Sequence, residues 1–166
     1  DDVAWKRFKR LAIDFDLSIP DNYGKTVELL DIDNFIDYIM LCVYVDMDDW
    51  PYNNWRAGRE RTARAKWRFY VWDAERSFGT DGKQMLGRQR RVVTSNNLTQ
   101  GALTSDAGIA RLFRSLMANP EFRLRFADRV HKHYFNGGVL TDEHIALRHR
   151  ELTEQMKHVL PDMSPY

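Results

Sequence analysis

The sequence predicts a mainly α-helical domain that contains one small β-hairpin, which places it in the α+β class. Apolar residues recur at helical spacing near both ends of the chain, and this indicates amphipathic helices there. Two short segments in the middle read as strands on either side of a charged turn. With 166 residues, of which 43% are hydrophobic, the chain can bury one good core, so we expect a single domain over residues 1–166.

The first third of the chain is expected to hold two helices separated by a loop. The first helix lies near Ala4–Phe15, where apolar residues alternate with basic ones at helical spacing. A proline and a glycine indicate a loop over Ile19–Lys25. The second helix is predicted over Asp33–Val45, capped near its start by Asp31 or Asp33. Because its second half is apolar on every side, it should be the central buried helix.

The middle of the chain is predicted to form an acidic turn, the hairpin and a long loop. Asp46–Pro51 is the turn, and the strands are Trp55–Arg59 and Lys66–Trp72, joined by the charged residues Glu60–Ala65. Thr80–Ser105 is rich in Gly, Asn, Ser and Thr and shows little periodicity. Roughly 25 residues without regular structure are uncommon in a compact domain and are usually functional or disordered. We therefore expect an irregular, substrate-facing loop there.

Three helices are predicted to close the chain. Their apolar stripes consist of Ile109, Leu112, Phe113, Leu116 and Met117 in the first helix, Phe122, Phe126, Val130 and Tyr134 in the second, and Ile145, Leu152, Met156 and Val159 in the third. Asn119 should end the first helix and cap the second, with Pro120 at its first position. Gly137 and Gly138 should end the second helix, and Thr141 should cap the third.

Composition and charge argue against several classes of function. Twenty-five Lys and Arg residues oppose 24 Asp and Glu, so no bulk attraction to nucleic acid or membranes is expected. The most apolar run, Tyr38–Val45, is far shorter than the ~20 residues of a membrane span. Cys42, the only cysteine, lies in this run and is predicted to be a buried small hydrophobe, without support for disulfides, structural zinc or thiol catalysis. His131 and His133 point different ways on a helix, so a metal pair is not expected.

Two short motifs carry the functional prediction. Asp49–Asn54 reads Asp-Trp-Pro-Tyr-Asn-Asn, and its Asp precedes its last Asn by the spacing of a protein kinase catalytic loop. Trp72–Gly79 reads Trp-Asp-Ala-Glu-Arg-Ser-Phe-Gly, in which an acid follows a strand-like run and precedes Phe-Gly, as the kinase metal-binding Asp does. The neighbours of Asp73 are aromatic and apolar, and a carboxylate buried among them is costly unless paired or metal-bound, so a functional role is expected. Simple turn or capping roles for Asp49 and Asn54 remain alternatives.

The motifs and their surroundings resemble the CotH family of atypical protein kinases, which is named for a spore-coat protein. The resemblance runs from about Leu29 to the last helix and includes the segments Leu29–Tyr38, Asp49–Trp55, Lys66–Asp73 and Leu116–Arg123. The last of these is similar to the family's Leu-x-x-Asn-Pro-x-Phe-Arg signature. One position departs from the family pattern, because the family usually reads Trp-Asp-x-Asp and the second acid here is Glu75. A Glu can still bind metal, but its side chain reaches further.

The resemblance implies the C-terminal lobe of a protein-kinase-like fold that transfers the γ-phosphoryl group of ATP to Ser or Thr of a protein substrate, with Mg²⁺. In that case Asp49 would orient and deprotonate the hydroxyl, while Asp73 and Asn54 would hold the metal. The Gly-rich loop and strand Lys of a nucleotide-binding lobe are not in this chain, so we expect an N-terminal lobe upstream of Asp1 and little activity without it. The resemblance also suggests an extracellular or cell-surface location.

Other functions remain open at this point. A pseudokinase or a surface or coat scaffold could share the fold, although a degenerate scaffold need not keep Asp49, Asn54 and Asp73. A carbohydrate-binding module would depend on aromatic residues alone, and Trp67 and Trp72 are predicted to be core residues instead. The hairpin also carries a cluster of basic residues, which either form a solvated turn or grip nucleotide phosphates or an acidic substrate. These basic residues are Arg56, Arg59, Arg61, Arg64 and Lys66.

Overall fold

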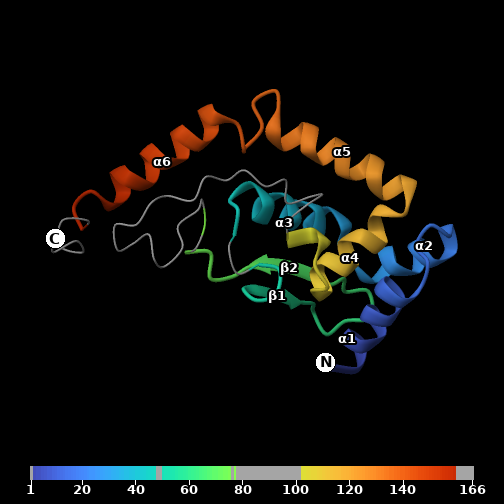
Figure 1. Ribbon diagram of the computed structural model, residues 1–166. Helices are drawn as coiled ribbons and strands as arrows, with labels where there is room; N and C mark the ends of the chain where they lie inside the picture. Colours follow the sequence, from blue (N-terminus) through green and yellow to red (C-terminus); the bar gives the residue numbers. More distant parts are fainter. Residues whose placement is uncertain (1, 48–49, 76, 78–101, 160–166) are drawn as a thin grey trace. The chain divides into compact units, whose positions relative to one another are not determined.

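The computed structural model describes residues 2–47, 50–75, 77 and 102–159 (Figure 1). Within these residues the chain forms helices and one two-stranded antiparallel sheet, so the predicted α+β class is confirmed. The chain divides into two compact units, Asp1–Arg125 and Phe126–Tyr166, which are described separately below. The predicted long loop Thr80–Ser105 lies mostly outside the described residues, apart from a short 3₁₀ turn, η3 (Ala102–Thr104), near its end.

The N-terminal helix of the first unit changes its winding part-way. Helix α1 (Asp2–Lys9) continues into a π-helical segment, η1 (Arg10–Asp14). Together they correspond to the single helix predicted near Ala4–Phe15. Phe8 in α1 and Ala12 in η1 are buried, so this helix packs one face into the core. Short π-helical segments are rare.

The prediction of a loop over Ile19–Lys25 is wrong, because helix α2 (Pro20–Leu29) occupies most of it. Pro20 stands in the first turn of α2, where its missing N–H removes no helical hydrogen bond. Gly24 lies on the exposed side of the helix, and no atom lies within 4 Å of where its Cβ would be. A proline and a glycine therefore begin and continue this helix instead of breaking it.

Helix α3 (Ile32–Tyr44) is the central buried helix, as predicted, and its bounds differ from Asp33–Val45 by one residue at each end. The Asp31 carboxylate caps it by accepting a hydrogen bond from the Asn34 N–H at 3.1 Å. The buried residues of α3 are Ile32, Phe35, Ile36, Tyr38, Ile39, Met40 and Cys42. Cys42 is a free, buried thiol, which confirms its predicted role as a small hydrophobe.

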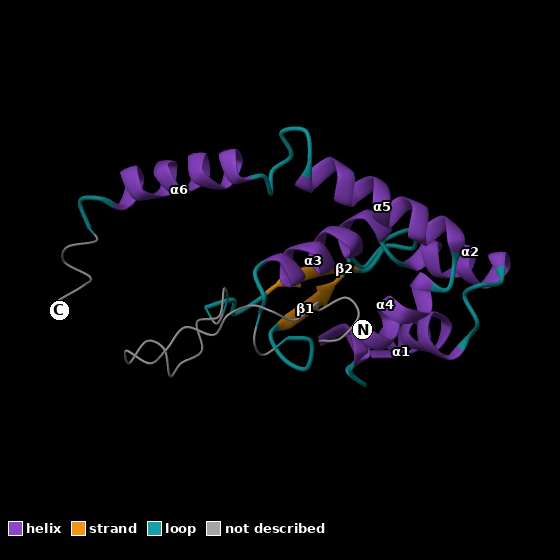
Figure 2. Ribbon diagram, turned by 45° about the horizontal axis from the view of Figure 1, so that its top comes forward, coloured by secondary structure: helices purple, strands orange, loops and turns teal. Residues whose placement is uncertain are grey.

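The predicted hairpin is present as strands β1 (Trp55–Gly58) and β2 (Arg68–Val71), which pair antiparallel from Trp55–Val71 to Gly58–Arg68. Helix α3 lies along β2 (Figure 2), and Phe35 packs its ring edge-on against Phe69 at 5.0 Å between ring centroids.

The backbone N–H and C=O groups at the outer edge of β2 form hydrogen bonds with residues outside the sheet. The Asn34 amide acts there like a strand partner, because its Nδ2 donates to the Phe69 carbonyl at 3.2 Å and its Oδ1 accepts from the Phe69 N–H at 2.6 Å. Just before β2, Trp67 exchanges backbone hydrogen bonds of 2.7 and 3.0 Å with Leu29 and Asp31. The start of α3 therefore sets the position of β2.

Helices α4 (Gly108–Met117) and α5 (Pro120–Tyr134) follow, joined at Asn119 as predicted. The Asn119 Oδ1 accepts hydrogen bonds from the Glu121 N–H at 2.9 Å and, more weakly, from the Phe122 N–H at 3.4 Å. Its Nδ2 donates to the Leu17 carbonyl at 2.8 Å. One buried side chain thus caps α5 and ties it to the N-terminal segment.

The second unit contains the rest of α5 and helix α6 (Asp142–Met156). Within the described chain α6 buries no residue, and Ile145, Leu152, Met156 and Val159 are between 39% and 49% exposed. The prediction that these residues form a buried stripe is therefore wrong. The amphipathic pattern specified a helix and its apolar face, but not a surface that covers this face.

Candidate functional site

The open end of the hairpin brings together two of the predicted site residues, Asn54 and Asp73. Asn54 comes directly before β1, and Asp73 follows two residues after the end of β2. The Asn54 Nδ2 donates a hydrogen bond to the backbone carbonyl of Asp73 at 3.2 Å. Both residues have a φ of 57°, in the left-handed region that Asn and Asp adopt more readily than most side chains. Asn and Asp therefore suit the backbone conformation that these two positions require.

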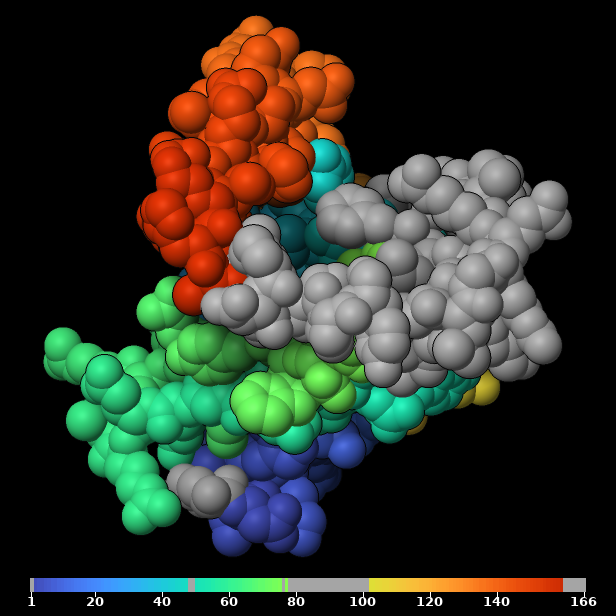
Figure 3. Space-filling view, turned by 90° about the vertical axis from the view of Figure 1, so that its left-hand side faces the viewer, coloured from blue at the N-terminus to red at the C-terminus, as the bar shows by residue number. Residues whose placement is uncertain are grey.

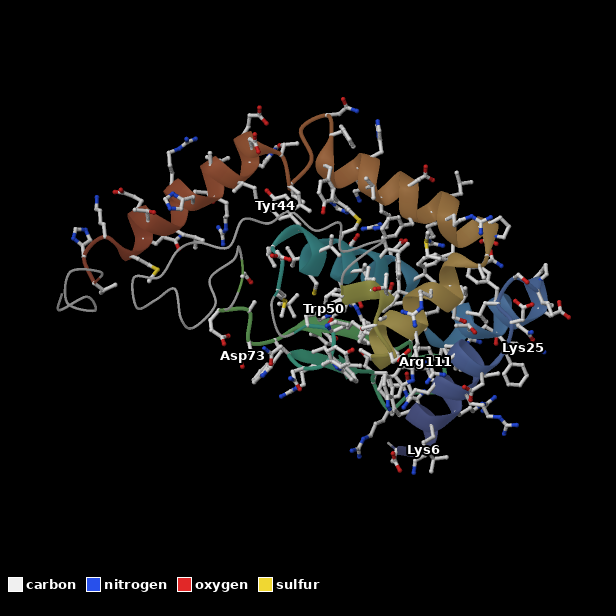
Figure 4. All side chains as sticks on the ribbon, in the orientation of Figure 1. Lys6, Lys25, Tyr44, Trp50, Asp73 and Arg111 are labelled. Carbon is white, nitrogen blue, oxygen red and sulfur yellow. The ribbon has the colours of Figure 1, made fainter. Side chains whose placement is uncertain are left out.

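Asp73 and Trp72 are more exposed than the sequence suggested. The prediction that apolar neighbours bury Asp73 is wrong, since its side chain is exposed, and the prediction of a core role for Trp72 is wrong as well, since it is 52% exposed. The last cross-strand pair is Trp55–Val71, so both residues lie where the chain has left the sheet. Figure 4 shows Asp73 beyond the strand ends. Trp67, by contrast, is buried as predicted.

Trp50 and Pro51, which follow Asp49 in the sequence, are anchored in the core. Asp49 itself lies outside the described residues. Trp50 is buried below α3 (Figure 4), where its Nε1 donates to the Tyr38 hydroxyl at 2.6 Å, and Pro51 is fully buried after a cis peptide bond. This anchoring role for Trp50 was not predicted, because its partner Tyr38 lies in α3, away from the motif.

A pocket of about 1090 Å³ opens along β1 and the ends of the hairpin. Asn54 and Asp73 line it together, and Trp5 of α1 contributes an aromatic wall. The Trp5 ring lies edge-on against Trp67, with 4.9 Å between centroids. In Figure 3 the hairpin and its turn, coloured green, form surface next to the blue N-terminal helix. Trp5 was predicted only as a helix residue, since nothing local indicates that it reaches the hairpin.

Two arginines of the pocket lining lie against tryptophan rings. The Arg56 guanidinium carbon is 4.7 Å from the centroid of Trp72, and that of Arg59 is 5.5 Å from the centroid of Trp67. Both arginines line the pocket. Glu75, the residue that departs from the family pattern, has an exposed side chain.

The oxygen atoms of Asn54 and Asp73 are suitable ligands for a hard cation. Carboxylate and amide oxygens bind Mg²⁺, which keeps several waters and commonly takes only one or two carboxylates beside substrate phosphates. The hydrogen bond from Asn54 Nδ2 to the Asp73 backbone fixes the plane of the amide that carries Oδ1. Among the described residues, no three His, Cys, Asp or Glu side chains cluster as a metal site. The residues present thus suit a Mg²⁺ held partly by substrate.

Two groups buried in α3, the Cys42 thiol and the Tyr38 hydroxyl, are not suited to proton transfer or nucleophilic attack. Burial raises the pKa of the Cys42 thiol to about 12 and also raises the pKa of the Tyr38 hydroxyl. Both groups therefore stay protonated at neutral pH, and thiolate chemistry at Cys42 is unsupported.

Comparison with protein families decides the family. The family described as "CotH kinase protein" matches residues 4–163, nearly the whole chain. This chain belongs to the CotH family. The resemblance drawn from the motifs is confirmed, and at the level of the family description this CotH chain is kinase-like. A search of curated proteins and a search of solved structures each found no match. Over the described part of the chain, no helix is long and apolar enough to span a membrane.

Proposed function

We propose that this CotH chain is the C-terminal, mainly helical lobe of a protein kinase. In its full-length parent it would transfer the γ-phosphoryl group of ATP to a Ser or Thr hydroxyl of a protein substrate, with Mg²⁺ as cofactor. The proposal is carried by the hydrogen bond that joins Asn54 to Asp73 in the lining of a pocket of about 1090 Å³. Ligand pockets commonly measure ~300–1,000 Å³, so this volume accommodates a nucleotide.

Each motif residue has a distinct role in the proposed reaction. Asp73 and Asn54 supply the carboxylate and amide oxygens for Mg²⁺, and the ion, when bound, neutralises charge on the phosphates. Asp49 orients the substrate hydroxyl and accepts its proton. Trp50, buried one residue after Asp49, helps to hold that segment in place. The catalytic contribution of the chain is then mainly positioning and charge, as is general in phosphoryl transfer.

We propose that a nucleotide-binding lobe of the full-length parent completes the site. Kinases cover the nucleotide with a Gly-rich loop and contact its phosphates with a strand Lys. We expect both on an N-terminal lobe, so that the chain alone has little or no activity.

The experiment measures incorporation of labelled phosphate into protein by the full-length parent and its variants. Asp73→Asn keeps the size of the side chain but removes its charge, so transfer should fall by at least ~100-fold. Asp49→Asn should abolish transfer while Mg·ATP binding, followed by thermal melting, stays nearly intact. Glu60→Gln is the matched control, because Glu60 is an exposed acid of the same hairpin and is not among the described residues lining the pocket.

The outcomes separate catalysis from a non-catalytic role. Because Asp73 is exposed, Asp73→Asn should leave the melting temperature without Mg·ATP unchanged. Unchanged incorporation in both variants would contradict the assigned roles. If the wild type neither incorporates phosphate nor melts at a higher temperature with Mg·ATP, the alternative of a pseudokinase or coat scaffold is favoured.

A further inference from the structure

We propose that Arg56 and Arg59 bind the phosphate chain of the nucleotide, each held in position by a tryptophan ring. The proposal rests on the function proposed above and deepens it. The sequence left the basic residues of the hairpin with two readings, a solvated turn or a grip for phosphates or an acidic substrate. The structure divides these residues into two groups. Arg56, Arg59 and Arg61 line the pocket, whereas Arg64 and Lys66 are exposed and lie outside its lining.

Arg56 is fixed by contacts that leave most of its donors available. Its guanidinium lies 4.7 Å from the Trp72 ring centroid, and its Nη1 donates to the Trp55 carbonyl at 2.9 Å. A guanidinium carries five N–H donors, and the bond to the Trp55 carbonyl uses one of them. Stacking on a ring face directs the donors outward along their own plane, which is the geometry that pairs with two phosphate oxygens. The Arg56 side chain is therefore arranged for an anion.

Arg59 of the pocket lining also lies against a tryptophan ring. Its guanidinium carbon lies 5.5 Å from the centroid of Trp67, a buried ring that Trp5 supports from its side. Arg59 follows directly after β1, so the two arginines are separated by only two residues of the strand. Side chains alternate along a strand, so Arg56 and Arg59 leave β1 toward opposite faces, and the pocket lining includes both. Two guanidinium groups in one lining suit a chain of phosphates better than a single charge.

The charges of the pocket favour an anionic ligand. Its lining contains three arginines and two aspartates, Asp2 and Asp73. Asp2 forms an ion pair with Lys6 at 2.6 Å, so it is already compensated on its own helix. Asp73 is the proposed metal ligand and would be compensated by the ion. The arginines of the lining outnumber its aspartates, which favours an anionic ligand.

The position of Arg56 selects the phosphates over another anion. Arg56 follows Asn54 by two residues, and its stacking partner Trp72 directly precedes Asp73. Mg²⁺ held by Asn54 and Asp73 would neutralise phosphate charge in this reaction class, so the phosphate chain would be expected beside Arg56. An acidic segment of the protein substrate would instead have to reach past the nucleotide.

Binding of inorganic tripolyphosphate to the 166-residue chain tests the proposal without metal or transfer. Calorimetric titration with a chelator present, at fixed ionic strength, should show ~10-fold weaker binding for Arg56→Ala, because a bidentate phosphate contact is lost. Arg56→Lys keeps the charge but not the fork and should recover only part of the affinity. Arg64→Ala removes the same charge from the exposed turn and should change the affinity by less than ~2-fold.

The role of Trp72 has its own control. Trp72→Leu should weaken tripolyphosphate binding, because the guanidinium loses the ring that orients it, and Trp72→Phe should restore most of the affinity. Trp72 is half-exposed, so both variants should melt at the temperature of the wild type.

The proposal is overturned if the wild type does not bind tripolyphosphate, or if Arg64→Ala weakens binding as much as Arg56→Ala. In the full-length parent, Arg56→Ala should raise the KM for ATP. A rise confined to the KM for the protein substrate would assign the arginines to an acidic substrate and overturn the phosphate assignment.

Asp73→Asn should leave metal-free tripolyphosphate binding intact or tighter. Binding that depends on Arg56 in a parent that transfers no phosphate would support this proposal while rejecting the proposed function.

Discussion

Helices α4 and α6 carry similar apolar stripes in the sequence, but the stripe of α4 is buried and that of α6 is exposed. In α4, in the first unit, Ile109, Leu112, Phe113 and Leu116 are at most 4% exposed. In α6, in the second unit, Ile145, Leu152 and Met156 are 39–41% exposed. The difference arises because α4 packs on η1, which is distant in sequence, and on η3, the 3₁₀ turn that precedes it. Periodicity thus predicts which face of a helix is apolar, and the rest of the chain decides whether this face is buried.

The largest expected effect tests the core of the first unit. Phe122→Ala should lower the free energy of unfolding by ~3–5 kcal/mol, because Phe122 is fully buried and its ring lies edge-on against Phe113 at 6.3 Å. Urea unfolding followed by circular dichroism gives the value. Leu124→Ala on the same helix is the control, since Leu124 is 66% exposed and should cost no more than ~0.5 kcal/mol. Equal losses would show that α5 is packed differently in solution.

The second prediction concerns the link between α3 and the hairpin. Asn34→Ala should destabilise the chain by ~2–3 kcal/mol, because both backbone groups of the buried Phe69 lose their side-chain partner. Urea unfolding measures the loss. Asn34→Asp keeps the acceptor for the Phe69 N–H but places a carboxylate against the Phe69 carbonyl, so it should also destabilise. A loss below ~0.5 kcal/mol for Asn34→Ala would mean that water replaces the amide at no cost.

A third, smaller effect depends on pH and tests whether water reaches the buried face of α3. Burial raises the pKa of Cys42 from 9.0 to about 12, so above pH 9 the unfolded chain loses a proton that the native chain keeps. This contribution to stability is fully present below pH 9 and falls by ~1.4 kcal/mol per pH unit until the folded pKa is reached.

The measurement compares urea unfolding of the wild type and Cys42→Ala at pH 8 and pH 10. The wild type should lose ~1.4 kcal/mol more than the variant between these values, because only the wild type carries the thiol. Equal losses in both proteins would indicate that the thiol of Cys42 is reached by water.

The smallest effect is expected in the second unit. Leu152→Ala in α6 should change the free energy of unfolding by no more than ~0.5 kcal/mol, since the side chain is 41% exposed and alanine favours helix. Thermal and urea unfolding of the chain give the value. A loss above ~2 kcal/mol would show that the stripe is buried in solution and would remove the contrast with α4.

Local signals predicted much of the fold. Asp31 and Asn119 could be recognised as caps because a cap acts within one turn of its own helix. The strand pair followed from two β-rich segments around a charged turn. Helix α2 was missed because Pro20 and Gly24 also occur inside helices, at a first turn and on an exposed face.

The candidate site was predictable only where its residues are close in sequence. The hairpin itself implied that Asn54 and Asp73 approach each other, since they flank its two strands. The different exposure of Trp67 and Trp72 could not be predicted, because it depends on where β2 ends and on a ring from α1. The contact of Arg56 with Trp72 likewise requires the strand register.

The amide of Asn34 has a consequence for how the hairpin can vary in length. Asn34 recognises the backbone of Phe69 and not its side chain, and Leu29 and Asp31 recognise the backbone of Trp67, so β2 is held by residues that precede the whole hairpin. Residues inserted into the exposed turn between β1 and β2 would extend that turn without moving β2. The distance along the chain from Phe69 to Asp73 would stay the same, and with it the place of the carboxylate. Gain or loss of residues in the turn can therefore alter the surface beside the pocket while leaving Asp73 where it is.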